Sequence, residues 1–200
     1  MLFCGAQNDD INRSDIFQSF HEITKPETLH YTNLDQTIET VEDHLIVNHG
    51  GYDAKDTGPE ALIKQPLLNN ISSLELDLIT QNIELLDFST GTKIIALGQE
   101  TDGIFLLLIG KVQIALGNGK YLGSVGAGTC FGELALISPN EKRQANVIAL
   151  THCHCARLSA KSLNRVFVQQ SGIRAKMLLN LSSILVERLN KSNGRVALNT

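Results

Sequence analysis

The region between Asp87 and Leu158 most constrains the fold, because it consists of short β runs separated by glycines. Closely spaced short strands with turn residues between them are typical of a barrel or a sandwich. A backbone role in turns and corners is sufficient for most of these glycines. The expected strands are Lys93–Leu97, Ile104–Ile109, Lys111–Leu116, Lys120–Val125, Asn146–Leu150 and Cys153–Leu158.

Helical patterns flank this β region. Before it, Ser72 and Glu75 form a capping box that opens a helix. After it, Ser159 caps a helical region that extends past Asn190, and we expect Gly172 to break or bend this region. One stripe of its second half contains Met177, Leu181, Leu185, Arg188 and Ser192, so the last two should point toward the barrel or a partner helix. The alternative is that Arg188 is a solvated cation near the helix end.

Residues 1–47 form a separate first segment, and residues 48–65 have the polar, glycine-containing composition of a linker. The first segment contains an expected short strand, Leu2–Gly5, and two amphipathic helices, at residues 9–21 and after Thr32. These elements have no core of their own. They must therefore pack on the next domain, on a partner chain or on a portion outside this sequence.

Residues 128–147 carry one acid and one base that are expected to be buried, Glu133 and Arg143, with a small-residue turn and a short apolar helical segment between them. An unpaired buried arginine would cost on the order of several kcal/mol, so Arg143 needs an anionic partner. Gly132 permits close backbone approach, and a short helix over residues 133–137 would present the N–H groups of Leu134 and Ala135 to a phosphate. Arg143 would hold the same phosphate and Glu133 would accept a sugar hydroxyl. The alternative is an internal Glu133–Arg143 ion pair that binds nothing.

The motif Phe131-Gly-Glu-Leu-Ala-Leu-Ile137, with Arg143-Gln-Ala145 after it, resembles the phosphate-binding cassette of cyclic nucleotide-binding domains. That family includes the catabolite activator protein and the regulatory subunit of the cyclic-AMP-dependent protein kinase. The resemblance runs from about Pro66 to the chain end, and it includes Leu97–Glu100, Ile104–Ile114 and Leu122–Gly128. It implies a mainly β fold with flanking helices over residues 66–200. The expected form is an eight-stranded jelly-roll or β-roll barrel with an N-terminal helix and C-terminal helices, preceded by an α/β fragment.

The resemblance also implies roles for single residues. Arg143 would hold the cyclic phosphate, and Glu133 would hold the ribose 2′-hydroxyl. Gln144 departs from the family, which usually has Ser, Thr or Ala there; its side chain could reach the phosphate or a base edge, or crowd the pocket. Backbone contacts would come from Gly132, Leu134, Ala135 and Ala145, pocket walls from Ile114, Leu122 and Val125, and helix contacts to the ligand from Arg188, Ser192 and Asn193.

The stretch from Asn33 to Ile46 resembles the closing helix of a STAS domain, which precedes nucleotide-binding modules in some sulfate-permease-like and glutaminase-like proteins. This resemblance implies that the sequence starts inside a domain. The alternative is an independent helical extension.

The net charge is −4 and no block of five like charges occurs, so the sequence predicts neither a nucleic-acid nor a membrane-surface patch. No apolar run is long enough to span a membrane, and no signal peptide is recognisable. The four cysteines, Cys4, Cys130, Cys153 and Cys155, show no disulfide framework, which favours a reducing, cytoplasmic setting.

The run His152-Cys-His-Cys155 lies in an expected strand, where side chains alternate between faces. The two histidines would share one face and the two cysteines the other, so one tetrahedral zinc ion could not collect all four. We expect inward cysteines, outward histidines and no metal.

The resulting hypothesis is a regulatory module that binds cyclic AMP or cyclic GMP and is not an enzyme. Phosphate capture would order the cassette, and the C-terminal helix would then close over the base. Because the sequence ends with the long helix and contains no helix-turn-helix, we expect a partner that is the rest of a larger protein or a second copy, not nucleic acid. The alternatives are a scaffold of the same fold that cannot bind the nucleotide, motivated by Gln144, and a metal-dependent enzyme of the cupin type.

Overall fold

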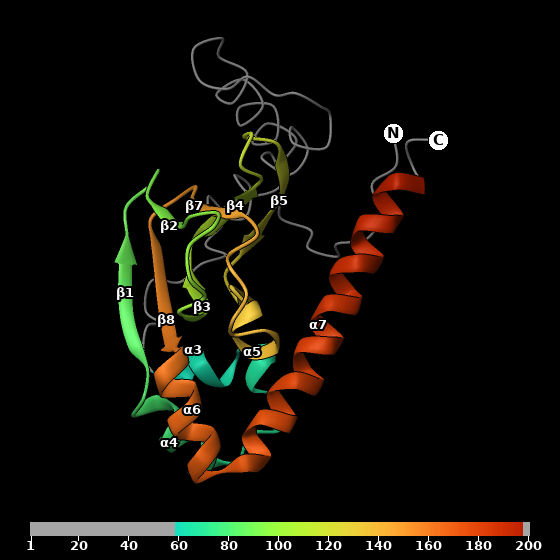
Figure 1. Ribbon diagram of the computed structural model, residues 1–200. Coiled ribbons are helices and arrows are strands. Elements are labelled where there is room, and N and C mark those ends of the chain that lie inside the picture. Colours follow the sequence, from blue (N-terminus) through green and yellow to red (C-terminus); the bar gives the residue numbers. More distant parts are fainter. Residues whose placement is uncertain (1–58, 198–200) are drawn as a thin grey trace, which may run out of the picture. The chain divides into compact units, whose positions relative to one another are not determined.

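The structure, a computed structural model, describes residues 59–197, with the side chains of residues 61–190. Eight strands form two four-stranded sheets in which every pairing is antiparallel (Figure 1). The first sheet has the order β1 (Glu84–Phe88), β8 (Cys153–Ser159), β3 (Gly103–Ile109), β6 (Thr129–Phe131). The second has the order β2 (Lys93–Ile95), β7 (Asn146–Ala149), β4 (Lys111–Ala115), β5 (Tyr121–Gly126).

The predicted mainly β fold with eight strands is confirmed, but the strands form two facing sheets and not a closed barrel. The six expected strands are all present. Two further strands, β1 and β6, had not been separated from their surroundings in the sequence. Strand β6 has only three residues, too few for alternation to be recognised.

Strand β3 separates two layers of the core. Ile104 and Leu106 face the helices, where they pack with residues such as Met177. Phe105 and Leu107 face the opposite sheet and pack with residues such as Val112 and Val147. The strand is therefore apolar on both faces, which explains its continuous hydrophobic run.

The helices cover the first sheet and gather at one end of the strands, from which α7 rises as a long helix (Figure 1). The capping box of Ser72 and Glu75 is present, and Ser159 caps α6, both as predicted. The helical elements are α3 (Pro59–Ile63), η1 (Pro66–Leu68), α4 (Ser73–Thr80), α5 (Leu134–Ile137), α6 (Ala160–Gln169) and α7 (Ser171–Ala197).

Two boundaries differ from the sequence analysis. The sequence predicts that residues 59–65 belong to the linker, yet Pro59–Ile63 form α3, and Ala61 and Leu62 are buried in the core of the domain. The two C-terminal helices separate at Gln170, whose backbone is not helical, whereas Gly172 lies within the first turn of α7. The expected elements of residues 1–47, and the STAS resemblance with them, lie outside the described residues.

Helix α7 packs on the domain mainly through its first half. Ile173, Met177 and Leu181 are buried there, and the Asn180 side chain donates hydrogen bonds to the carbonyl oxygens of Leu67 and Asn69. Beyond Leu181 the predicted apolar stripe becomes more exposed, since Leu185 is 37% exposed. The helix therefore has a docked first half and a less covered second half.

Candidate ligand-binding site

Gly132 connects β6 to α5 and has a left-handed backbone with φ +75°. A Cβ atom at this position would lie 2.7 Å from Nη1 of Arg143 and 3.2 Å from the carbonyl oxygen of Gly103. Both the backbone angle and the lack of space therefore require glycine. Helix α5 begins at Leu134, with Glu133 as its N-cap, one residue later than the sequence predicts.

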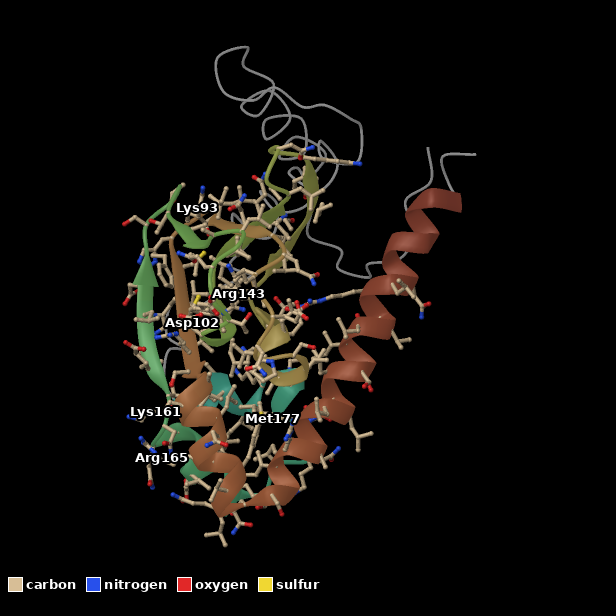
Figure 2. The ribbon with its side chains drawn as sticks, viewed as in Figure 1. Lys93, Asp102, Arg143, Lys161, Arg165 and Met177 are labelled. Carbon is tan, nitrogen blue, oxygen red and sulfur yellow. The ribbon has the colours of Figure 1, made fainter. Side chains whose placement is uncertain are left out.

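Arg143 is buried, with 3% exposure, on the turn that precedes β7 (Figure 2). Its Nη2 donates to Asp102 Oδ1 at 2.7 Å and to the carbonyl oxygen of Gly103 at 2.6 Å. Its Nη1 donates to the carbonyl oxygen of Gly132 at 3.0 Å. These three bonds use three of the five guanidinium N–H groups and leave two for a further acceptor.

Asp102 is the anionic partner of Arg143, and it contacts a second arginine as well. Its Oδ2 lies 2.6 Å from Nη2 of Arg157, on β8. Partial burial tends to raise the pKa of Asp102. The hydrogen bond from Arg143 and the charges of both arginines outweigh this effect, so the pKa is lowered and the carboxylate stays ionised.

Glu133 pairs with Arg188 of α7 and not with Arg143. The distance from Arg188 Nη1 to Glu133 Oε1 is 3.3 Å, and Arg188 also donates to the carbonyl oxygen of Cys130. The internal Glu133–Arg143 pair, the alternative from the sequence, is therefore wrong. Arg188 points toward the cassette, as the helical stripe predicted, and is not a solvated cation.

The first turn of α5 contributes backbone N–H groups. Ala135 N–H already donates to the carbonyl oxygen of Gly132 at 3.2 Å. Leu134 is the first residue of α5, a position whose N–H has no partner inside a helix. Of the two predicted phosphate-binding N–H groups, that of Leu134 is thus the better candidate.

The predicted wall residues do not all share one face. Ile114 is opposite Gly123, and Val125 is opposite Val112, so Ile114 and Val125 lie on the same side of the β4–β5 pair. A Cβ atom at Gly123 would meet nothing within 4 Å, which leaves open space beside Ile114. Leu122 is the extra residue of a bulge and is 53% exposed, so it does not face this space as predicted.

Gln144 and Ala145 continue the turn after Arg143. The turn is held by Arg143 N–H donating to the carbonyl oxygen of Gln99 and by Gly98 N–H donating to that of Arg143. The Gln144 side chain is exposed, and Ala145 is half-buried. The side chains of Ser192 and Asn193 lie outside the described residues.

Two residues of this arrangement, Asp102 and Arg157, had not been identified from the sequence. A signal was present for Arg157, because alternation along β8 places it on the same face as the buried Cys153 and Cys155. An inward arginine needs an anionic partner. The partner, Asp102, is 55 positions away in the sequence, and only the fold brings the two together.

The histidine and cysteine run has the predicted alternation. Cys153 and Cys155 are fully buried, while the His154 side chain on the other face is 12% exposed and its Nδ1 lies 3.0 Å from Oδ1 of Asp87 on β1. Burial raises the pKa of Cys130 to about 11 and also raises the pKa of Cys155, so these thiols stay protonated. Within the described part of the chain, no group of three His, Cys, Asp or Glu side chains is arranged to hold a metal ion.

Residues 85–170 match the family model described as a cyclic nucleotide-binding domain. Glutaminase 1 of Bradyrhizobium diazoefficiens is 31% identical over 164 residues, which are 82% of this chain and 26% of the glutaminase. The regulatory subunit of the cAMP-dependent protein kinase of Mycosarcoma maydis is 30% identical over 121 residues, 58% of this chain and 23% of that protein. The chain thus spans about a quarter of the length of each of these relatives.

A cyclic nucleotide-binding domain from Methylobacillus flagellatus superimposes with a TM-score of 0.61 at 23% identity, covering 72% of this chain and 83% of that one. That likeness supports the fold of two antiparallel sheets with flanking helices. Among the described residues, no helix is sufficiently long and apolar to traverse a bilayer. The family match, the fold and the cassette around Gly132 and Arg143 agree, and residues 85–170 belong to the cyclic nucleotide-binding domain family.

Proposed function

We propose that this chain binds a cyclic purine nucleotide, cyclic AMP or cyclic GMP, whose phosphate contacts Arg143. The observation that carries the proposal is the buried guanidinium of Arg143. It donates hydrogen bonds to the backbone carbonyl oxygens of Gly132 and Gly103, and two of its N–H groups remain for a ligand. A buried arginine fixed in this way is suited to fork-shaped recognition of a phosphate. The similarity to a cAMP-dependent regulatory subunit supports the same ligand class.

Glu133 would accept a hydrogen bond from the ribose 2′-hydroxyl. In the structure it contacts Arg188 across 3.3 Å, and both side chains are about a quarter exposed. A partly exposed ion pair of this length is weak, so a ligand hydroxyl can share or displace it at small cost. Ile114, Val125 and the open space at Gly123 would accommodate apolar parts of the ligand.

Control would operate through α7. Its first half is anchored by Met177 and Leu181, whereas Arg188 in the second half contacts the cassette. The second half of α7 would have two positions, one with Arg188 on Glu133 and one without this contact. A ligand that competes for Glu133 or adds contacts to α7 changes the relative stability of these two positions. The ligand can shift that equilibrium only by its differential affinity for the two positions.

The protein would be a regulatory module of a larger protein and not itself an enzyme. The chain covers only 26% of the glutaminase it resembles, which supports an attached domain as the output. An exposed apolar surface of α7 would contact that domain or a second copy of the chain; it consists of Leu179, Val186 and Leu189. Three free cysteines among the described residues are in keeping with a cytoplasmic setting.

A second candidate is a scaffold of the same fold that does not bind nucleotide. The observation in its favour is that Arg143 already has the carboxylate of Asp102 and Glu133 already has Arg188. Each charged group of the cassette is thus neutralised within the domain. The two candidates make opposite predictions in a direct binding measurement.

The test is a calorimetric titration of the wild-type chain with cyclic AMP, cyclic GMP and 2′-deoxy cyclic AMP. Binding of at least one of the first two in the micromolar range, about −8 kcal/mol, is the expected result. The deoxy analogue should bind about 10-fold more weakly than cyclic AMP because it cannot donate to Glu133. Absence of heat with all three ligands would refute nucleotide binding and favour the scaffold.

A further inference from the structure

Arg157 is a charged side chain on the inner face of the first sheet that the proposed ligand contacts do not use. It lies opposite Glu84 of β1 and opposite Phe105 of β3. Its guanidinium lies 5.9 Å from the centre of the Phe105 ring, and Phe105 stacks on Phe131 with ring centres 5.0 Å apart. Phe131 directly precedes Gly132, so this row of side chains crosses the sheet from its edge strand to the cassette.

The contacts of Arg157 converge on Asp102. Its Nη2 lies 2.6 Å from Asp102 Oδ2 and also donates to the carbonyl oxygen of Asp102 at 3.4 Å. Its Nη1 donates to Glu84 Oε2 at 3.0 Å. The Arg157 side chain is 22% exposed, whereas the carboxylates of Asp102 and Glu84 are both more than half exposed. Arg157 is therefore the more fixed member of this group of charges.

We propose that Arg157 is a positioning residue for the phosphate-binding Arg143, and that it acts by holding one oxygen of Asp102. This inference rests on the proposed function. Arg143 contacts Oδ1 of Asp102, and Arg157 contacts Oδ2. An arginine and a carboxylate frequently form a bidentate contact, in which both carboxylate oxygens accept hydrogen bonds from the guanidinium. Arg157 prevents that contact from forming between Asp102 and Arg143.

The contact between Arg157 and Asp102 affects the number of N–H groups of Arg143 that a ligand can use and the positive charge that the ligand meets. With one oxygen on Arg143, two N–H groups of its guanidinium remain for a ligand. A second oxygen would occupy one of them and neutralise more of the charge that the phosphate needs. Without Arg157, Asp102 becomes a competitor of the ligand for Arg143.

The experiment compares nucleotide affinity in Arg157→Gln with that in Glu84→Gln. Arg157→Gln removes the cation on Asp102 and should weaken cyclic nucleotide binding ~5–10-fold. Glu84→Gln cuts the other ion pair of Arg157 but leaves its contact with Asp102, so affinity should stay within about twofold of wild type. Arg157→Lys keeps a cation near Asp102 Oδ2 and should restore most of the affinity.

A double-mutant cycle separates this role from a structural one. In the Asp102→Asn background, the change Arg157→Gln should alter affinity by less than about twofold, because the carboxylate through which it acts is gone. If Arg157→Gln binds like wild type, or weakens binding equally with and without Asp102, the proposal is wrong. Circular dichroism of each variant identifies any loss of affinity that is due to unfolding.

A crystal structure of Arg157→Gln decides the question without any ligand. The expected result is that both oxygens of Asp102 contact the Arg143 guanidinium. An Asp102 that keeps a single oxygen on Arg143 would overturn the proposal. This readout also applies if the wild-type chain binds neither nucleotide, in which case the proposed function fails while the positioning role is still decided.

Discussion

At the scale of single residues, Gly132 of the cassette can be compared with Gly128, which directly precedes β6. Both have left-handed backbones, with φ +75° and φ +80°. A Cβ atom at Gly128 would meet nothing within 4 Å, whereas one at Gly132 would lie 2.7 Å from Arg143 Nη1. The two glycines therefore separate the cost of backbone conformation from the cost of displacing Arg143.

We predict that Gly128→Ala reduces the free energy of unfolding by about 1–2 kcal/mol, the cost of a left-handed alanine, and that Gly132→Ala reduces it by more, because its methyl group must also displace Arg143. Only Gly132→Ala should also weaken nucleotide binding, because the new methyl group displaces the guanidinium. Urea unfolding and calorimetric titration of both variants measure the two effects. Equal affinities in the two variants would contradict the role assigned to Gly132.

The sequence predicted that Arg143 is buried, which the structure shows, but it did not predict the partners of Arg143 and Glu133. A buried arginine beside a glycine turn is evident from local spacing, and so is an acid at the start of a short helix. The partners Asp102 and Arg188 lie 41 and 55 positions away from Arg143 and Glu133, and their approach depends on how the strands and α7 pack. Spacing within a motif carries no information about such distant contacts.

At the scale of elements, α7 is anchored by its buried first half. Leu181 is 1% exposed and packs in the core between the first sheet and the helices. We predict that Leu181→Ala lowers the free energy of unfolding by about 2–5 kcal/mol, because it leaves a cavity. Val168→Ala, at a position of α6 that is 77% exposed, is the control and should change stability by less than about 0.5 kcal/mol. Similar losses in both variants, measured by urea unfolding, would contradict this account of the anchor.

A second anchor of α7 depends on pH. Lys176 of α7 donates to Glu75 Oε2 at 2.6 Å, and the backbone N–H of Ser72 donates to the same oxygen at 2.8 Å. The hydrogen bonds from Lys176 and Ser72 lower the pKa of Glu75 from 4.5 to about 2. Because the folded state lowers this pKa, its contribution to stability is complete above pH about 4.5 and is lost as the pH falls toward about 2.

We therefore expect the free energy of unfolding of the wild-type chain to fall over this acidic range more steeply than that of Glu75→Gln. Urea unfolding at several acidic pH values measures the difference. Parallel pH profiles for the two chains would show that the Glu75 contacts do not stabilise the fold.

Among the elements, those with clear local signals were predicted and those without were not. Ser72 and Ser159 mark helix starts through their capping side chains, and both were located correctly. Helix α3 was assigned to the linker, because five residues after a polar, glycine-containing stretch show no periodicity. Its burial of Ala61 and Leu62 is a property of tertiary packing, which local composition does not reveal.

At the scale of the whole molecule, one face of α7 presents an apolar stripe formed by Leu179, Val186 and Leu189, which are 70%, 58% and 62% exposed. Helical spacing places this stripe nearly opposite the buried residues Met177 and Leu181. The separations of seven and three residues are those of helix pairs that associate along a seam.

We predict that the chain self-associates through this stripe, and that Leu189→Glu abolishes the association without unfolding the domain. Asn164→Glu adds the same charge at an exposed position of α6, outside the stripe, and should leave association unchanged. Sedimentation equilibrium of the three chains measures the effect. A monomeric wild-type chain would contradict this prediction.

The most direct test of the central claim is a calorimetric titration with cyclic AMP and cyclic GMP of the wild-type chain, Arg143→Ala and Arg165→Ala. Arg165 is an exposed arginine of α6 and serves as the control (Figure 2). If Arg143 holds the cyclic phosphate, Arg143→Ala should lose at least ~30-fold in affinity, while Arg165→Ala should bind like wild type. Equal binding by a folded Arg143→Ala, or no binding by the wild-type chain, would contradict the assignment of this arginine as the phosphate contact.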